Sequence, residues 1–154
     1  KVENLMQDTA LSHLEKVYVL IDDYVEKFFS QQEFHKIMMR EQLSEKNTHV
    51  TDLIHELKKR NHESIKALIQ DGQKKGTFKK NIDLVFMMAT LTGIASQIVT
   101  TQRFYRDVNN MGDIPTEEFS KQLKKKLSTY LKNIFKAILS NEEAKSRIRL
   151  QLNK

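Results

Sequence analysis

The chain has 154 residues, of which 39% are apolar and 30% are charged, a balance that predicts one folded domain with a sizeable core. Only 4 glycines and 1 proline occur, so turn-rich all-β folds are excluded and long helices are favoured. Cysteine is absent, which excludes disulfides, thiol catalysis and cysteine zinc sites, and no segment has the roughly 18 apolar residues of a membrane span.

The charge is divided unevenly along the chain. Residues 1–57 carry 6 basic and 11 acidic side chains, a net charge of −5, whereas residues 58–154 carry 20 and 9, a net charge of +11. A basic half can indicate a nucleic acid or an acidic partner. Solvated helix faces explain the lysine runs more simply, because neither a recognition-helix pattern nor an aromatic stacking platform accompanies them.

Two helices are predicted in the first third of the chain. The first spans about Leu5 to Phe29, where apolar side chains recur with the 3.6-residue period of a helix. Ser30, with Glu33 three residues later, forms a capping-box pattern. This pattern predicts a second, shorter helix that ends at about Ser44.

The next helical segment has two possible starts and two possible ends. Thr48 or Thr51 can serve as its N-cap, and Gly72 or Gly76 as the left-handed residue that ends it. An interval without apolar residues lies near residue 60. The segment is therefore either one long helix or two helices broken at that point.

An apolar helix with two usable faces is predicted from Asn81 or Asp83 to about Asp107, in the middle of the domain. After a loop, Pro115 begins a last long helix that runs to about Ser140. The fold class is therefore predicted to be all-α, with about six helices in one domain.

Enzyme motifs are absent from the sequence. It contains neither a glycine-rich phosphate loop nor a nucleophile elbow. His55 and Glu56 begin a zinc-protease motif, but Lys59 stands where the second histidine is needed. The neighbouring carboxylates Asp22 and Asp23 point about 100° apart on a helix, so they form no catalytic pair. We therefore expect no enzyme activity, no catalytic residues, no metal site and no cofactor.

A pattern in the middle of the chain resembles the C-terminal ligand-binding domain of TetR-family transcriptional regulators. It consists of Gly72-Gln-Lys-Lys-Gly76-Thr-Phe78, then Asn81-Ile-Asp83, and then a long apolar helix that contains Leu91-Thr-Gly93. In that family a helix ends at G-x-x-x-G-x-F, and a short loop with an acidic residue leads into the central helix. The order of helices also fits, over roughly residues 5–140.

One departure from the family is large, because no N-terminal helix-turn-helix precedes these helices. The chain begins without methionine, at the place where the family's connecting helix begins. We therefore expect a regulatory fragment of a longer, cytoplasmic repressor. DNA is expected as a partner only through the missing N-terminal domain, and no membrane partner is expected.

The resemblance implies one regulatory domain over residues 1–154, with residues 1–29 as the connecting helix and residues 82–140 as the dimerisation helices. A small, mainly apolar effector would bind inside the bundle and move the connecting helix. Flexible methionine pairs suit such a pocket, although ordinary core filling also explains them. By helical phase, the candidate ligand-binding residues are Tyr24, Phe28, Met38, Met88, Leu91 and Thr92. Among them, Tyr24 and Thr92 would supply the polar contacts.

A homodimer is expected from the last two long helices. The final helix has an apolar arc that is wider than its own core needs, and the central helix has a second face of small and polar residues. Two such helices from each chain can form a four-helix interface across a two-fold axis. The candidate interface residues are Gly93, Gln97, Phe104, Phe119, Leu123, Leu127, Tyr130 and Ile134. Internal packing of the arc in a monomer is the alternative.

Two other functions remain open at this stage. The first is a helical protein-interaction module without a ligand pocket, which a compact core without a cavity would favour. The second is a basic nucleic-acid-binding helical bundle that uses the C-terminal lysines. Salt-dependent binding to DNA or RNA would favour the second.

Overall fold

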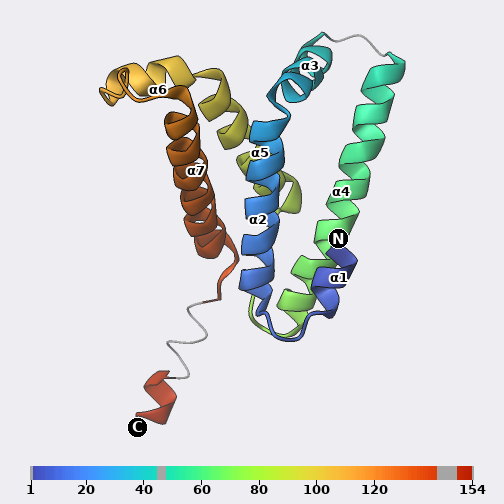
Figure 1. The fold of residues 1–154 in the computed structure, drawn as a ribbon. Helices are drawn as coiled ribbons and strands as arrows, with labels where there is room; N and C mark the ends of the chain where they lie inside the picture. The colour runs from blue at the N-terminus through green and yellow to red at the C-terminus, as the bar shows by residue number, and fades with distance from the viewer. Residues whose placement is uncertain (1, 45–47, 142–148, 154) are drawn as a thin grey trace.

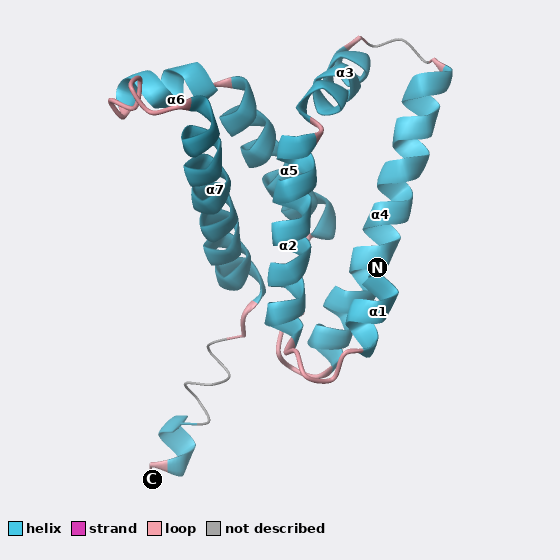
Figure 2. Cartoon of the chain, in the orientation of Figure 1, coloured by secondary structure: helices cyan, strands magenta, loops and turns pink. Residues whose placement is uncertain are grey.

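The computed structural model describes residues 2–44, 48–141 and 149–153. Within these ranges the chain is helical, and its only β-type pairing is one isolated bridge between Phe78 and Ser140 (Figures 1 and 2). The predicted all-α class is confirmed. The named helices are α1 (Val2–Gln7), α2 (His13–Ser30), α3 (Gln32–Leu43), α4 (His49–Lys74), α5 (Leu84–Thr100), α6 (Gln102–Val108) and α7 (Thr116–Leu139).

The predicted first helix is wrong in one respect, because residues 8–12 divide it into α1 and α2. The Asp8 carboxylate accepts a hydrogen bond from the Ala10 N–H at 2.9 Å. Ser12 then caps α2: its hydroxyl accepts from the Glu15 N–H at 3.2 Å, and the Glu15 carboxylate accepts from the Ser12 N–H at 2.7 Å. These side chains satisfy backbone donors that helix carbonyls would otherwise satisfy, so a new helix begins here.

The predicted cap at Ser30 is also wrong. Ser30 is the last residue of α2, and its hydroxyl donates to the Lys27 carbonyl oxygen at 3.1 Å. Gln31 is the single residue between α2 and α3, and no side chain caps α3. The chain therefore turns sharply from α2 into α3.

The start of α4 agrees with one of its two predicted positions. Thr48 is the N-cap, and Thr48 and Thr51 exchange hydrogen bonds between side-chain oxygen and backbone N–H at 2.9 and 3.2 Å. The helix continues without a break to Lys74. The question left open near residue 60 is therefore answered by one long helix.

The end of α4 explains the glycine motif. Gly76 has a φ of +75°, in the left-handed region where glycine is favoured. The Thr77 N–H bonds the Gly72 carbonyl at 2.9 Å and the Gly76 N–H bonds the Gln73 carbonyl at 3.2 Å, which is a Schellman motif. Phe78, 1% exposed, lies directly against Gly72, where an added Cβ would be 2.2 Å from the ring. The glycines and the phenylalanine thus form one packing unit.

The predicted central helix is shorter than expected. Asp83 caps α5, but α5 ends at Thr100 instead of continuing to about Asp107. The hydroxyls of Thr100 and Thr101 donate to carbonyl groups one turn earlier, at 2.8 and 2.6 Å. Hydroxyls that bond in this way often bend helices, and α5 and α6 meet here at 70°.

Among the described residues, no single helix has both the length and the apolar content needed to cross a membrane. The bent pair of α5 and α6 reaches that length and composition only when its two helices are taken together.

The main core lies where α2, α5 and α7 pack together, and Phe78 and the last turns of α4 complete it. The helix α7 begins after Pro115 and ends at Leu139, in agreement with the prediction. Its buried side chains recur at every fourth position: Phe119, Leu123, Leu127, Leu131, Phe135 and Leu139.

Polar contacts fix α7 against α2 at the edge of this core. Lys124 pairs with Glu26 at 2.9 Å, and Lys132 pairs with Asp22 at 2.7 Å. Ser128 also donates to the Asp22 carboxylate. Burial acts to raise the pKa of Asp22, but the hydrogen bonds from Lys132 and Ser128 outweigh it, so the net pKa is lowered.

A second, smaller core holds the loop between α6 and α7. Met111 is buried there with Phe119 and Leu123. Arg106 donates to three carbonyl groups of this loop, among them that of Ile114, and lies 4.7 Å from the centre of the Phe119 ring. This end of α7 therefore has its own anchoring contacts, and Phe29 and Ile98 pack against both cores.

Candidate functional site

The inner face of α4 is covered at both ends and uncovered in its middle. Ile54 is 7% exposed and Leu68 is 1% exposed. Leu57 and Asn61 continue the same face at the helical period, but Leu57 is 43% exposed and Asn61 is also exposed. Figure 1 shows α4 diverging from α2 toward α3. Leu57 and Asn61 therefore form a face that the described part of the chain leaves largely open, here called the uncovered face of α4.

Aromatic side chains occupy the facing helix. Tyr24 and Phe28 lie one turn apart on α2, with ring centres 5.7 Å apart. The Phe28 ring stacks on His35 of α3 at 4.3 Å, with 13° between the ring planes. Burial raises the pKa of Tyr24, so its hydroxyl stays protonated. Within the described residues, that hydroxyl makes no hydrogen bond, which leaves a donor for a bound molecule.

The register of α2 and α4 places Tyr24 and Asn61 at the same level. The two helices run in opposite directions and are joined near one end, where His13 Nε2 lies 2.8 Å from Asp71 Oδ2. At 1.5 Å per residue, Tyr24 and Asn61 both lie roughly 16 Å from this joint. Tyr24 of the aromatic cluster and Asn61 of the uncovered face of α4 therefore lie at the same height along the two helices.

His35 gives the aromatic cluster a predicted pH dependence. Burial lowers the pKa of His35, so the unfolded chain binds this proton more readily than the folded chain. The His35 contribution to stability is therefore lost as the pH falls below its unfolded pKa of about 6.5. When the pH is lowered from neutral to mildly acidic, we expect the melting temperature of His35→Phe to fall less than that of the wild type. His55→Phe is the matched control, because His55 is exposed on α4 and its replacement should leave that fall unchanged.

The remaining predicted pocket residues are distributed unequally. Leu91 is buried in the main core, and Met88 is half-buried against it. Met38 is half-buried on α3 and belongs to neither core, whereas Met88 packs against the main core. Thr92 is exposed, and its hydroxyl donates to the Met88 carbonyl of its own helix at 3.1 Å. The Thr92 hydroxyl therefore bonds within its own helix, and its role as a polar contact for a ligand stays a prediction.

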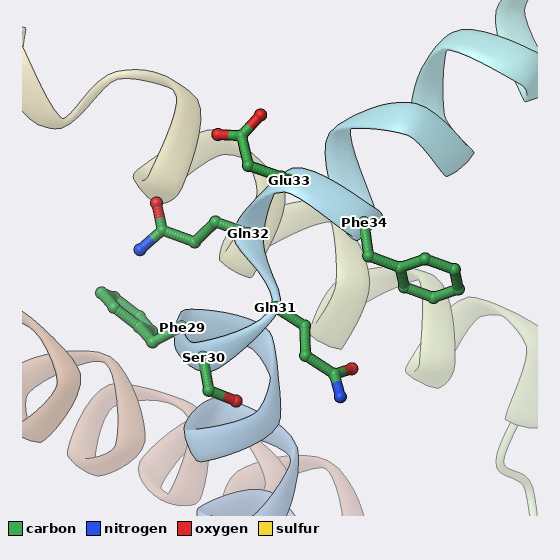
Figure 3. A pocket seen from close by; sticks show the side chains of 6 residues that line it. All are labelled: Phe29, Ser30, Gln31, Gln32, Glu33 and Phe34. Carbon is green, nitrogen blue, oxygen red and sulfur yellow. The ribbon is translucent and has the colours of Figure 1, made fainter.

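A shallow, open hollow of about 700 Å³ lies at the turn from α2 to α3, lined by residues 29–34. Figure 3 shows Phe29 and Gln32 on one side of the turn and Gln31 and Phe34 on the other. These side chains do not converge on a single point. The hollow therefore offers no constellation of functional side chains.

A larger groove of about 920 Å³ lies between α5, α6 and α7. Isoleucine and tyrosine side chains line it together with amides and two lysines. Five predicted interface residues line it: Gly93, Gln97, Leu123, Leu127 and Tyr130. Tyr130 is 59% exposed, so it offers a large ring to a partner surface. We call this surface the α5/α7 groove.

The predicted interface residues differ in how far they are exposed. Phe119, Leu123 and Leu127 are buried in the cores of this chain, because they belong to the stripe of α7 that faces inward. They cannot provide the bulk of an exposed contact surface. Ile134 is half-buried and Phe104 is exposed, and neither lines the α5/α7 groove. The accessible centre of this face is formed by Gly93, Gln97 and Tyr130 instead.

In the described ranges, no group of three or more histidine, aspartate or glutamate side chains is placed to hold an ion.

The family of the chain follows from comparison with known proteins. A protein-family model described as "Tetracyclin repressor-like, C-terminal domain" matches residues 14–126. The chain belongs to this family. Searches of curated proteins and of solved structures found no match. The matched TetR region begins in α2 and ends within α7, and it includes both the uncovered face of α4 and the glycine motif.

The structure divides the segment predicted to be the connecting helix into two helices. Residues 1–29 do not form one helix, because α1 and α2 are separated at residues 8–12. The TetR match starts at Leu14, just inside α2. The Ser12–Glu15 capping box was the sequence signal that could have located this boundary.

Proposed function

We propose that this chain is the effector-sensing and dimerising part of a TetR-type, DNA-binding transcriptional repressor. TetR-like C-terminal domains are regulatory domains, and this coarse role follows from the family. The ligand is proposed to bind between the aromatic cluster of α2 and α3 and the uncovered face of α4. The observation that carries the proposal is the inner face of α4, apolar and covered at its ends but open at Leu57. Because the intact regulator would act on DNA, it is proposed to lie in the cytoplasm.

The chemistry of the walls indicates the kind of effector. Leu57 supplies exposed apolar surface, which suits a mainly apolar molecule. Phe28 is 3% exposed and belongs to the main core, so it supports this wall from behind. The protonated hydroxyl of Tyr24 can donate one hydrogen bond to an acceptor on that molecule. The effector is therefore proposed to be small and mainly apolar, with at least one hydrogen-bond acceptor.

Binding of such a molecule is tested by a thermal-shift screen with apolar compounds, followed by titration calorimetry of the compounds that raise the melting temperature. Tyr24→Phe is expected to weaken binding by roughly 2- to 10-fold, the value of one hydrogen bond. Leu57→Trp is expected to abolish binding, because the indole fills the space in front of α4.

His55→Trp is the control for the second variant, since His55 lies on α4 outside the uncovered face. It should bind as the wild type does. Equal loss of binding in both tryptophan variants would show that the compounds bind elsewhere, and full binding by Leu57→Trp would remove the site from α4.

The proposed partner is a second copy of the chain, seated on the α5/α7 groove. Gly93 supports this choice, because an added Cβ there would have no atom within 4 Å and the backbone is open to close approach. Helices that expose glycine beside aromatic side chains can pack closely against their symmetry mates. The lysines at the rim, such as Lys125, would remain in water.

A further inference from the structure

We propose that Thr77 is an acylation site, where the threonine hydroxyl, activated by His13 and oriented through Asp71, accepts the acyl group of a small acyl phosphate. The three residues come from the start of α2, the last turns of α4 and the loop after α4. This modification site is separate from the proposed ligand site and from the α5/α7 groove. It therefore stands whether or not an effector binds beside α4.

Three side chains form a continuous chain of hydrogen bonds here. His13 Nε2 lies 2.8 Å from Asp71 Oδ2, and His13 Nδ1 lies 2.9 Å from Thr77 Oγ1. A hydroxyl, an imidazole and a carboxylate in this order form the arrangement in which an imidazole takes the proton of a nucleophilic hydroxyl. The His13 side chain is only 13% exposed, whereas Thr77 is exposed. The base is therefore largely shielded from water, and the nucleophile is open to a reactant.

The ionisation of Asp71 decides which nitrogen of His13 is the base. Hydrogen bonds from His13 and Lys75 lower the pKa of Asp71, so its carboxylate is ionised and can only accept. In the neutral imidazole, Nε2 therefore carries the proton and donates it to Asp71. His13 Nδ1 is left with a lone pair that faces the Thr77 hydroxyl.

The Thr77 hydroxyl has one competing acceptor, the Gly72 carbonyl oxygen at 3.2 Å. That oxygen already accepts from the backbone N–H groups of Thr77 and Phe78, at 2.9 and 3.1 Å. Because a carbonyl oxygen has two lone pairs, both are occupied. The Thr77 hydroxyl therefore donates to His13 Nδ1, which leaves a lone pair of Oγ1 for attack on a carbon atom.

Packing holds the nucleophile and the base in place. The His13 ring makes an edge contact with Phe78 at 5.8 Å, and Phe78 is 1% exposed. The Lys79 N–H bonds the Leu139 carbonyl at 2.8 Å, which fixes the loop to the end of α7. The hydroxyl and the imidazole are thus in reacting geometry before any reactant arrives, which lowers the entropic cost of the reaction.

The charge around Thr77 indicates the kind of acyl donor. Four exposed lysines flank it in the same segment of the chain: Lys74, Lys75, Lys79 and Lys80. Lys75 pairs with Asp71 at 3.3 Å. Lys74 and Lys80 form no ion pair with any described residue. Such a basic segment attracts an anionic donor, so an acyl phosphate is favoured over a neutral ester.

The step transfers the acyl group from phosphate to Thr77. As the bond from Thr77 Oγ1 to the acyl carbon forms, His13 Nδ1 takes the hydroxyl proton and the bond from that carbon to the phosphate oxygen breaks. The proton then passes to the departing phosphate, so the products are an O-acyl threonine and inorganic phosphate. The backbone N–H groups of residues 76–79 all bond carbonyl oxygens and form no oxyanion hole. One modification per chain is therefore expected, without turnover.

Acetyl phosphate is the probe, and mass spectrometry of proteolytic peptides measures the rate of acetylation at each residue. Alkaline hydroxylamine cleaves acetyl esters but leaves acetyl-lysine amides intact, so it distinguishes Thr77 from the neighbouring lysines. Thr116, an exposed threonine at the start of α7, is the internal reference. We expect Thr77 to be acetylated at least about 100-fold faster than Thr116, the lower end of the effect of a positioned base.

Substitutions test the two supporting roles. His13→Ala should reduce the rate at Thr77 to that at Thr116, and free imidazole should restore part of it by acting as the base in the vacated space. Asp71 is a positioning residue, so Asp71→Asn should lower the rate, and Asp71→Glu, which keeps a carboxylate, should retain more of it. His55→Ala is the control and should react as the wild type does, because His55 is exposed on α4 and makes no side-chain hydrogen bond within the described residues.

Equal acetylation of Thr77 and Thr116 overturns the inference, as does a Thr77 rate that His13→Ala leaves unchanged. Circular dichroism establishes that each variant is folded. If His13→Ala does not fold, His13→Phe, which keeps a ring beside Phe78, is judged by the same loss of rate. Thr77→Val should remove the hydroxylamine-sensitive acetyl group. Persistence of that group in Thr77→Val would place the ester on another residue and also overturn the inference.

Discussion

Gly72→Ala is expected to lower the free energy of unfolding by about 1 to 3 kcal/mol, through overpacking and displacement of a buried aromatic ring. The added Cβ would be 2.2 Å from one Phe78 ring carbon and 2.7 Å from another, so the ring must move. Phe78 is almost fully buried and touches the main core, and it has no free space to enter. The helical preference of alanine over glycine recovers only about 1 kcal/mol. Denaturant unfolding followed by circular dichroism measures the loss.

The cause of that loss is tested in a Phe78→Ala background. Without the ring, Gly72→Ala should be neutral or stabilising, because only the helical preference remains. An equal loss in both backgrounds would contradict the steric explanation. Gly112→Ala is the control, since an added Cβ there meets no atom within 4 Å, and its effect should stay within about 0.5 kcal/mol.

The helix boundaries show which sequence signals could be used and which could not. Capping-box patterns occur at Ser12 with Glu15 and at Ser30 with Glu33, and the chain uses only the first. Local spacing cannot choose between them, because each has the same chemistry. The choice depends on packing: extending α2 to Ser30 keeps Phe28 in the main core.

The bend after α5 is only weakly indicated by the sequence. Thr100 and Thr101 turn their hydroxyls back onto the helix, but threonine also occurs inside straight helices. The apolar period continues to Phe104, which favoured one long helix. Phe104 is in fact 68% exposed on α6. The apolar period therefore extends beyond the residues that pack in the core.

Helical phase predicted only part of the candidate site, because phase does not determine which helix covers a given face. Phase fixes which residues share a face, so Tyr24 and Phe28 do lie together on α2. It does not fix which neighbouring helix covers that face. Thr92 is expected in the interior by phase, but its side chain is exposed. Leu127 lines the α5/α7 groove but is only 4% exposed, because it also packs in the main core.

Gly93→Arg is expected to raise the dissociation constant of the proposed homodimer by roughly 30-fold or more, the effect of a perturbation of at least about 2 kcal/mol at the centre of an interface. The monomer should fold normally, because Gly93 is exposed and an added side chain there meets no atom within 4 Å. In the dimer, the same side chain would place an arginine between closely packed helices. The free energy needed to bury that charge without a partner opposes association.

Sedimentation equilibrium of the wild type, Gly93→Arg and Thr92→Arg separates the possible interfaces. Thr92 is the neighbouring exposed residue on α5 and points about 100° away from Gly93, so Thr92→Arg should dimerise as the wild type does. Loss of dimer in both variants would place the interface on a broader surface of α5 than the α5/α7 groove. A wild type that remains monomeric at tens of micromolar would refute the dimer. Leu127→Glu cannot replace these variants, because it buries a charge in the main core and should unfold the chain before it affects association.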